Sequence, residues 1–373
     1  MGPSSSQRGL VVSADDTTGA LESAAVAADV GWHATVVPHG RFDGADAAPG
    51  HAVVVDLRSR HSPPGVAAAR FAEVASSVRV HKIDSTLRGN WPAELSAAIR
   101  AGRRVLMVPA FPAAGRVCID GIVHEHGVPV ERTVHGRDPR SSVRTSRPAS
   151  LLDGAVELSS AHAVRSWLQA GAPAAVVDAS TDDDIAAALD AIAGRDDVLP
   201  AGPAAVVAAV AGRAVGDGAR PTWITRLPVV VVCGSAHPVS RSQVAQLVAA
   251  GAVPADVVDE MPVSTPTPAV AVVTSPDHPD GDPAGVVRAL ADRARQLVRA
   301  MGATTVVLVG GDTAEAFIGD GVVRVDCSIG TGVAAGWVTM DGRRLALISK
   351  PGAFGGERTL VDLMQPAFDG SAR

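Results

Sequence analysis

The chain has 373 residues, of which 47% are hydrophobic and 19% charged, a composition typical of a folded globular protein. Its net charge of −6 and its lack of any run rich in lysine and arginine exclude nucleic acid and anionic membranes as main partners. The three cysteines are far apart, so we expect no disulfide framework or zinc site and a cytoplasmic location. We expect no membrane span or secretory signal, and this length favours two domains.

The first part of the chain alternates short apolar runs with helical patterns. The pattern predicts strands at 10–15, 34–37, 52–57, 79–84, 104–111 and 173–178, and helices at 17–31, 66–77, 92–101 and 184–194. This alternation is typical of a parallel sheet covered by helices on both faces. Residues 115–150 interrupt it with turn signals and short alternating runs, which predicts a β-hairpin insertion.

A polar stretch at 216–228 separates a second series of elements, so we place the domain boundary there, between 1–220 and 221–373. Strands are predicted at 229–233, 269–273, 304–309, 322–326, 335–340 and 344–349, with helices at 239–250, at 283–301 and after Gly311. Residues 253–273 carry four prolines and are predicted to form an irregular connection. The predicted fold is α/β, with two domains that each contain a mainly parallel sheet flanked by helices.

Charged residues follow two predicted strands of the first domain. Asp15 and Asp16 follow the first strand, and either one of them faces a ligand while the other caps the next helix, or both are cap and turn residues. Arg58 and Arg60 follow the third strand, where they form either an anion-binding pair or a solvated loop. These strand ends meet at the edge where open α/β sheets bind ligands.

The stretch "HKIDSTLRGN" (81–90) is the richest in polar side chains. Lys82 and Asp84 are two residues apart and are expected to share a strand face, and Asn90 is expected to cap the following helix. A salt-bridged strand end would explain the stretch alone. Three such loops on one sheet favour instead a site that holds an anion and moves a proton.

Glycine-containing loops mark the second domain. "VGGDTAEAFIG" (309–319) lacks the Lys-Ser/Thr of a P-loop, and "GTGVAAG" (330–336) fits a dinucleotide fingerprint but is followed by a strand pattern. "SKPGAFGGE" (349–357) places Lys350 beside three glycines. Each loop alone could be a tight turn, but together they favour a nucleotide-binding half opposite a substrate-binding half.

These motifs resemble, in order and over nearly the whole chain, those of the four-carbon acid sugar kinase family. The similar stretches are "ADDTTGA" (14–20), "KIDSTLRGN" (82–90), "PAFPAAGR" (109–116), "CGS" (233–235), "GGDTA" (310–314) and "KPGAFG" (350–355). The resemblance implies ATP-dependent phosphorylation of the terminal hydroxyl of a sugar acid such as threonate, erythronate or a 3-oxo-tetronate. It also implies an acid-sugar domain at 1–220 and an ATP domain at 221–373, and such a transfer uses Mg²⁺ to bridge the phosphates.

On this basis we expect Arg60 and Arg88 to hold the substrate carboxylate, Lys82 to offset developing charge, and Asp84 or Asp16 to act as the base. The expected substrate-binding residues are Asp15, Asp16, Arg60, Lys82, Ser85, Thr86 and Arg88. The expected ATP-binding residues are Gly234, Ser235, Gly310, Gly311, Asp312, Thr313, Gly330, Gly332, Lys350, Gly352 and Gly355. The sequence assigns no metal ligand, and it leaves a homodimer open.

Two other functions remain open from the sequence. One is a nucleotide- and sugar-acid-binding protein of the same fold with altered catalysis, because "AGPAAVVAA" (201–209), "DCSIGTGVAAG" (326–336) and the 350–355 loop depart from the family's motifs. The other is an NAD-dependent oxidoreductase, which would need the 330–336 loop to open a helix.

Overall fold

The computed structural model of the chain describes residues 9–138, 140–213, 223–255, 267–276 and 282–365. The fold is α/β, with mostly parallel strands flanked by helices and a small antiparallel sheet. The chain forms two compact units, Met1–Arg220 and Pro221–Arg373. The assignment of sugar acid to the first and of ATP to the second stays a prediction.

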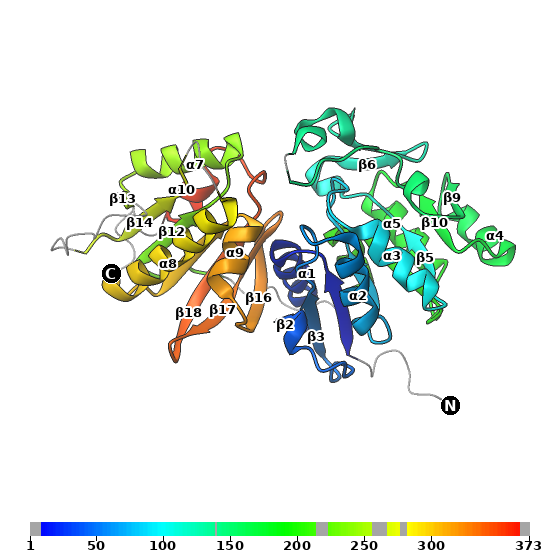
Figure 1. The fold of residues 1–373 in the computed structure, drawn as a ribbon, viewed down its shortest axis with the longest axis horizontal. Helices are drawn as coiled ribbons and strands as arrows, with labels where there is room; N and C mark the ends of the chain where they lie inside the picture. Colours follow the sequence, from blue (N-terminus) through cyan, green and yellow to red (C-terminus); the bar gives the residue numbers. More distant parts are fainter. Residues whose placement is uncertain (1–8, 139, 214–222, 256–266, 277–281, 366–373) are drawn as a thin grey trace. The chain divides into compact units, whose positions relative to one another are not determined.

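In the first unit every described strand of the main sheet pairs in parallel with its neighbours (Figure 1). The strand order is β2 (His33–Pro38), β3 (His51–Asp56), β1 (Leu10–Ala14), β4 (Val80–Lys82), β11 (Val198–Gly202), β5 (Arg104–Met107), β10 (Ala174–Val177) and β9 (Ala155–Leu158). All five residues of β1 are buried, as expected for a strand covered on both faces.

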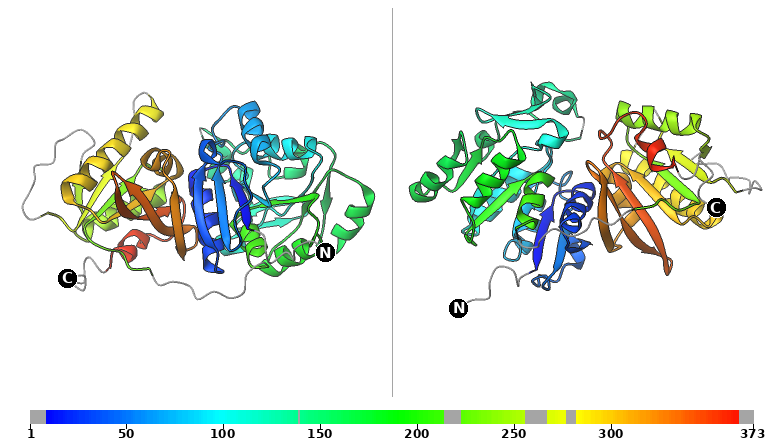
Figure 2. Two further views of the ribbon diagram at one scale, coloured as in Figure 1. Left: turned by 90° about the horizontal axis from the view of Figure 1, so that it is seen from below. Right: turned by 180° about the vertical axis from the view of Figure 1, so that it is seen from behind.

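Helices cover both faces of these strands (Figure 2). Helix α1 packs on α6 and α5 packs on both α6 and α4, whereas α2 and α3 pack together. The helices are α1 (Thr17–Asp29), α2 (Pro64–Val74), α3 (Trp91–Arg100), α4 (His162–Ala170), α5 (Asp182–Asp190) and α6 (Ala204–Ala211). Short 3-10 helices lie at His39–Arg41, Pro112–Ala114, Val130–Arg132, Val134–Arg137 and Pro148–Leu151.

The predicted hairpin insertion is present and has a third strand. Strands β6 (Arg116–Ile119), β7 (Ile122–Glu125) and β8 (Val128–Pro129) form the small antiparallel sheet. The sequence pattern missed β9, α4, β11 and α6. In α6, eight consecutive Ala and Val residues give no helical period, and β9 is mostly exposed.

The second unit has a mixed sheet. Its strand order is β13 (Val253–Ala255), β14 (Val270–Thr274), β12 (Val229–Cys233), β15 (Thr305–Val309), β18 (Arg343–Lys350), β17 (Val333–Met340) and β16 (Val323–Gly330). The pairs from β13 to β18 are parallel, and β18, β17 and β16 are antiparallel. Helices α8 (Pro283–Met301) and α9 (Gly311–Ile318) pack together, as do α7 (Pro238–Ala249) and α10 (Thr359–Leu363).

Two features of the second unit differ from the prediction. The predicted irregular connection 253–273 begins with the short strand β13, while its residues 256–266 lie outside the described residues. Helix α10 was not predicted. In the described part of the chain, no helix combines the length and the apolar composition needed to cross a membrane.

Candidate active site

The charged loops of the first unit begin at three adjacent strand ends. Ala14 of β1 is in register with Asp56 of β3 on one side and with Lys82 of β4 on the other. Helix α1 leaves β1 on one face of the sheet, whereas α2 and α3, which follow β3 and β4, cover the other face (Figure 1). Such a point of divergence is where open α/β sheets bind ligands.

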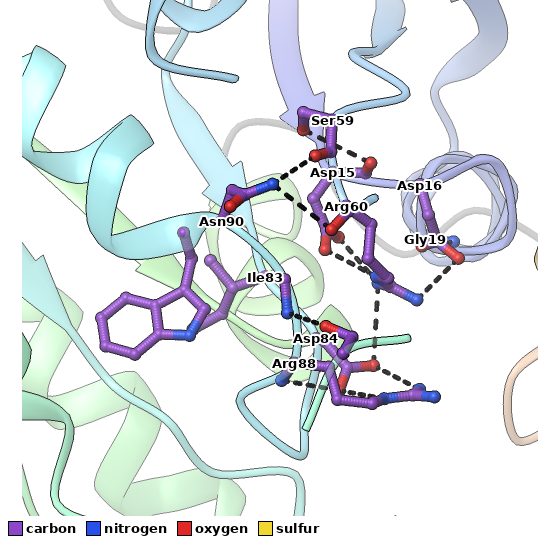
Figure 3. Close-up of polar contacts among 12 residues, drawn as sticks. Asp15, Asp16, Gly19, Ser59, Arg60, Ile83, Asp84, Arg88 and Asn90 are labelled. Carbon is purple, nitrogen blue, oxygen red and sulfur yellow. Dashed lines mark hydrogen bonds and ion pairs between the residues drawn. The ribbon is translucent and has the colours of Figure 1, made fainter. Parts of the chain in front are cut away.

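The guanidinium group of Arg60 lies at the centre of this site (Figure 3). Its Nε and Nη2 each donate to Asp15 at 2.8 Å, and its Nη1 donates to Asp16 Oδ2 at 2.8 Å. Its Nη2 is also 3.6 Å from Asp84 Oδ1. Burial lowers the pKa of Arg60, but the three carboxylates outweigh burial and raise that pKa well above its ordinary value.

The two adjacent aspartates have different surroundings. Asp16 caps α1, because its Oδ1 accepts a 2.9 Å hydrogen bond from the Gly19 N–H. Asp15 is completely buried, and burial, with a further contribution from Asp16, raises its pKa to about 6 against the opposing effect of Arg60. One aspartate is therefore a cap that also pairs with Arg60, and the other is the buried anchor of Arg60.

Asp84 is held mainly by Arg88. Arg88 Nη2 donates to Asp84 Oδ1 at 2.9 Å and Nε donates to Oδ2 at 3.0 Å, while Thr86 donates through both its N–H and its hydroxyl. Burial raises the pKa of Asp84, but Arg88 and Arg60 outweigh burial and hold that pKa well below its ordinary value. Ser85 lies buried in the same turn.

The prediction that Lys82 and Asp84 share a strand face is wrong. Strand β4 ends at Lys82, and Asp84 lies in the turn that follows. Lys82 Nζ lies 3.4 Å from Glu22 Oε2 on α1 and donates to the Ile83 carbonyl at 3.1 Å. The local charge balance at Asp84 therefore comes from arginines and not from Lys82.

Gly89 allows this cluster to close. Its φ of +94° is one that L side chains rarely adopt, and a Cβ there would lie 2.9 Å from Asp15 Oδ2 and 3.3 Å from Arg60 Cγ. Its N–H donates to Ser141 Oγ at 2.8 Å. In the same region Arg88 Nη1 is 3.6 Å from Asp138 Oδ2.

The sequence predicted that the Asn90 side chain caps α3, but it does not. Asn90 occupies the N-cap position without a side-chain cap hydrogen bond, and its Nδ2 donates instead to the carbonyls of Ser59 and Ser62, both at 2.7 Å. These bonds fix the loop that carries Arg60, and the bond to Ser59 is drawn in Figure 3.

A buried chain of hydrogen bonds, which the sequence did not reveal, supports the same loop. Ser13 Oγ lies 2.8 Å from His81 Nδ1, His81 Nε2 lies 3.0 Å from Glu94 Oε2, and Ser59 Oγ donates to Glu94 Oε1. All four residues are completely buried. They connect β1, β4, α3 and the loop after β3. Their distant positions in the sequence give no indication that they meet.

In the second unit, loops that carry predicted ATP-binding residues also begin at adjacent strand ends. Cys233 is in register with Val309, and Val309 with Lys350. A Cβ on Gly234 would lie 2.2 Å from Thr313 Oγ1, and one on Gly352 would lie 2.2 Å from Ser235 Oγ. The structure therefore brings the loops after β12, β15 and β18 together.

The remaining predicted ATP-binding residues surround these loops. Gly310 has a φ of +108° and precedes α9, whose first turn contains Gly311 and Asp312. Gly330 and Gly332 lie at the turn between β16 and β17, where a Cβ on Gly332 would lie 2.8 Å from Phe354 Cδ1. Gly355 lies on the same loop as Phe354. No helix begins in the 330–336 stretch, as expected from its strand pattern.

Lys350 is completely buried and holds its own loop. Its Nζ donates to the carbonyls of Pro351 and Phe354 at 2.8 Å and of Gly352 at 3.4 Å. Ser240 Oγ donates to the Gly352 carbonyl at 2.7 Å. Burial lowers the pKa of Lys350 to about 8.

Comparisons with known proteins identify the family of this chain. Residues 10–210 match the family model of a sugar-binding N-terminal domain. Over 400 aligned residues the chain is 32% identical to D-threonate kinase of Bordetella bronchiseptica, with 94% of this chain and 96% of that protein covered. The chain belongs to the four-carbon acid sugar kinase family. It is a sugar-acid kinase, a phosphotransferase that acts on an alcohol group.

Two further matches extend the comparison of this kinase. A D-erythronate kinase of Heliobacterium modesticaldum is 30% identical over 162 residues, which cover 38% of this chain and 35% of that protein. A solved structure from Bordetella bronchiseptica, a domain-swapped dimer with bound citrate, is 27% identical with a TM-score of 0.50, and the match covers 96% of this chain and 98% of that one.

Proposed function

We propose that this kinase transfers the γ-phosphoryl group of ATP to the terminal hydroxyl of a four-carbon sugar acid, with D-threonate as the first candidate. The match to a D-threonate kinase covers 94% of this chain, whereas the match to a D-erythronate kinase covers 38%. D-erythronate is therefore the second candidate, and a 3-oxo-tetronate is the third.

The meeting of two arginines at one carboxylate oxygen is the observation that carries this proposal. Arg60 Nη2 and Arg88 Nη2 lie 3.6 Å and 2.9 Å from Asp84 Oδ1. The aspartates hold both guanidinium groups in place before any substrate arrives, which lowers the cost of orienting an anionic substrate. Arg88, whose side chain is 28% exposed, is the more accessible of the two for a substrate carboxylate.

Asp84 and Asp16 are both candidates for the carboxylate that accepts the hydroxyl proton. Asp84 is ionised at neutral pH because its pKa is low, and Asp16 is 14% exposed at the start of α1. Replacing the base by Asn should lower kcat by roughly 10²–10⁴-fold with little change in KM. At the aspartate that only orients an arginine, the same replacement should mainly raise KM for the sugar acid.

We place ATP on the second unit, with its phosphates against the backbone of Gly234, Gly310 and Gly352, because glycine lets backbone N–H groups approach a phosphate closely. The described residues hold no cluster of three His, Cys, Asp or Glu side chains suited to a metal ion. Magnesium in kinases is bound largely by the phosphates with one or two carboxylates, and Asp312, in the first turn of α9 after the glycine loop, is the carboxylate that would hold it. Bound Mg²⁺ would neutralise phosphate charge.

A coupled assay of ADP release tests the function. The enzyme is given ATP and, in turn, D-threonate, L-threonate, D-erythronate, L-erythronate and a 3-oxo-tetronate. Release above the ATP-only rate with at least one acid, and none with butanoate, supports the proposal. ADP binding without turnover of any acid would support the catalytically altered binding protein instead, and tight binding of NAD in place of ADP would support the oxidoreductase.

Location and assembly are further parts of this proposal. The related Bordetella structure is a domain-swapped dimer, so we expect a homodimer here, to be tested by sedimentation of the purified protein. A cytoplasmic location stays a prediction, to be tested by cell fractionation.

A further inference from the structure

Two polar atoms on α1 are buried without a hydrogen-bond partner among the described residues. They are Thr18 Oγ1 and Glu22 Oε1, in side chains whose residues are 5% and 7% exposed. Buried polar atoms in proteins are nearly always paired, and leaving one unpaired is unfavourable, most of all for a carboxylate. The two residues are one helical turn apart, so they lie on the same face of α1.

This pair lies beside the site already described. Lys82 Nζ, at the end of β4, is 3.4 Å from Glu22 Oε2, so the second oxygen of Glu22 is the one left without a partner. Burial raises the pKa of Glu22, Lys82 opposes this effect, and Asp16 adds to it. Asp16 also pairs with Arg60 at 2.8 Å. The Asp16 carboxylate therefore acts on both Glu22 and Arg60.

We propose that Thr18 and Glu22 form the subsite that binds the chain hydroxyls of the sugar acid, with Lys82 holding Glu22 in place. The inference rests on the proposed function, because it requires a hydroxylated acid to bind at these strand ends. It assigns opposite ends of the substrate to opposite sides of the site, with the carboxylate on the arginines and the hydroxyls on α1.

The chemistry of the two side chains favours hydroxyls over other groups. The unpaired carboxyl oxygen of Glu22 accepts a hydrogen bond, whereas the Thr18 hydroxyl both donates and accepts. A carbon-bound hydroxyl also donates and accepts, so neighbouring hydroxyls of one acid satisfy both residues. A site built to bond a hydroxyl discriminates strongly against a substrate that lacks it, because its own polar atoms then stay unpaired.

The sequence offers a second indication. Glu22 is the single charged residue between Asp16 and Asp29, in a helix otherwise rich in alanine. A carboxylate is rarely buried in such a helix unless it is paired or bound to a ligand. The Lys82 contact accounts for one of its two oxygens.

The test compares two acids that share a carboxylate and a terminal hydroxyl. D-threonate carries two further hydroxyls, and 4-hydroxybutanoate carries none. The variants are Glu22→Gln, Thr18→Val and the conservative Thr18→Ser. The matched control is Ser23→Ala on the same helix, whose buried hydroxyl is already paired, because it donates to the Gly19 carbonyl at 2.7 Å.

We expect wild-type enzyme to favour D-threonate in kcat/KM by about 100-fold or more. Glu22→Gln and Thr18→Val should lower kcat/KM for D-threonate by about 10- to 100-fold, since hydrogen bonds to charged groups are among the stronger ones, and leave 4-hydroxybutanoate within about threefold. Thr18→Ser and Ser23→Ala should retain the preference. Equal loss with both acids, or no loss, would overturn the inference and leave these atoms to buried water.

Failure of the proposed function would look different. If wild-type enzyme phosphorylates neither these acids nor the rest of the four-carbon panel, the function falls. The subsite is then judged by calorimetric Kd values of the same two acids. A preference for D-threonate that Thr18→Val abolishes and Ser23→Ala retains still supports the subsite, whereas equal affinity of wild-type protein for the two acids overturns it.

Discussion

At the scale of single residues, Asp15 should make the stability of the protein depend on pH. Its pKa is about 6 in the folded chain, against an ordinary value of 3.8. Between these values the folded state keeps a proton that the unfolded state has lost. The contribution of Asp15 to the free energy of unfolding therefore falls as the pH rises from about 4 to about 6, by roughly 2 kcal/mol in total.

Urea unfolding of wild type and Asp15→Asn at intervals between pH 4 and 7 measures this effect. The variant has no titrating group at this position, so its stability lacks the contribution of Asp15 to the pH dependence. The stability of the wild type minus that of the variant should fall across the window and level off above about pH 6. A difference that rises across the window, or stays flat, would mean that Asp15 is ionised throughout and that Arg60 outweighs burial.

Gly89→Ala should disturb the Arg60 cluster. The new Cβ would meet Asp15 Oδ2 and Arg60 Cγ and would also carry the cost of a φ of +94°. We expect a loss of about 1–3 kcal/mol in stability and a raised KM for the sugar acid. Gly102→Ala is the matched control, since its φ is +85° but a Cβ there meets nothing within 4 Å. Gly102→Ala should lose stability because of its positive φ but keep the wild-type KM.

The sequence predicted which charged residues lie close together, but it did not predict which of them form ion pairs. The loops holding Asp15, Arg60 and Asp84 were predicted to meet, because parallel strands present their carboxyl ends at one edge. The shared strand face of Lys82 and Asp84 was predicted wrongly, because the predicted strand 79–84 ends in the structure at Lys82, before Asp84. The partner of Lys82, Glu22, lies 60 positions away on α1, and only the packing of α1 on the sheet brings it there.

At the scale of elements, the buried bonds of Ser13, His81, Glu94 and Ser59 connect two strands, one helix and one loop. Removing the central carboxylate leaves His81 and Ser59 buried without their partner. Glu94→Leu should therefore destabilise the protein by about 2–4 kcal/mol and, because Ser59 precedes Arg60, raise the sugar-acid KM.

Urea unfolding and steady-state kinetics check this prediction. Arg100→Ala, at the exposed end of the same helix, is the control and should change stability by less than about 0.5 kcal/mol. If Glu94→Leu were as stable as wild type with an unchanged KM, the network would be irrelevant to the position of Arg60. Loss of stability with an unchanged KM would restrict its role to folding.

Elements with clear periodicity were predicted well, and the misses share a physical cause. Strands β1 and β12 are short runs of buried apolar residues, and α8 has a regular amphipathic pattern, so local sequence specifies each. Strand β11, which ends at Gly202, and helix α6 form one continuous apolar stretch with Pro203 between them. Nothing local indicates that the first half pairs between β4 and β5.

At the scale of the whole molecule, the chain has two groups of loops at strand ends, one on each of two compact units. The first group is rich in paired charges and the second in glycine. The order of the motifs along the chain made this contrast visible in the sequence, while the loops within each group meet only through sheet registers such as Cys233 with Val309 and Val309 with Lys350. If the first unit binds the sugar acid and the second binds the nucleotide, a single substitution should lower the affinity for one ligand and not for the other.

The pair Gly352→Ala and Arg88→Ala tests this separation. A Cβ on Gly352 would lie 2.2 Å from Ser235 Oγ, so the loop must shift where we place the phosphates. We expect ADP affinity to fall at least about tenfold while D-threonate affinity is retained. Arg88→Ala should do the reverse and weaken D-threonate binding by roughly 2–5 kcal/mol, because it removes a charged partner from a largely buried site. Gly356→Ala is the loop control, since a Cβ there meets nothing within 4 Å.

Isothermal titration of wild type and of the three variants with ADP and, separately, with D-threonate measures the affinities that decide the question. The prediction is a crossed pattern, in which each substitution weakens one ligand and spares the other while Gly356→Ala spares both. If Gly352→Ala weakened D-threonate as much as ADP, the glycine loop would serve both ligands. If Arg88→Ala weakened ADP as much as D-threonate, the arginine cluster would bind phosphate as well as carboxylate. Either result would contradict the assignment of one ligand to each unit. If each ligand bound to a different unit, a substitution in one site should not lower the affinity for both ligands equally.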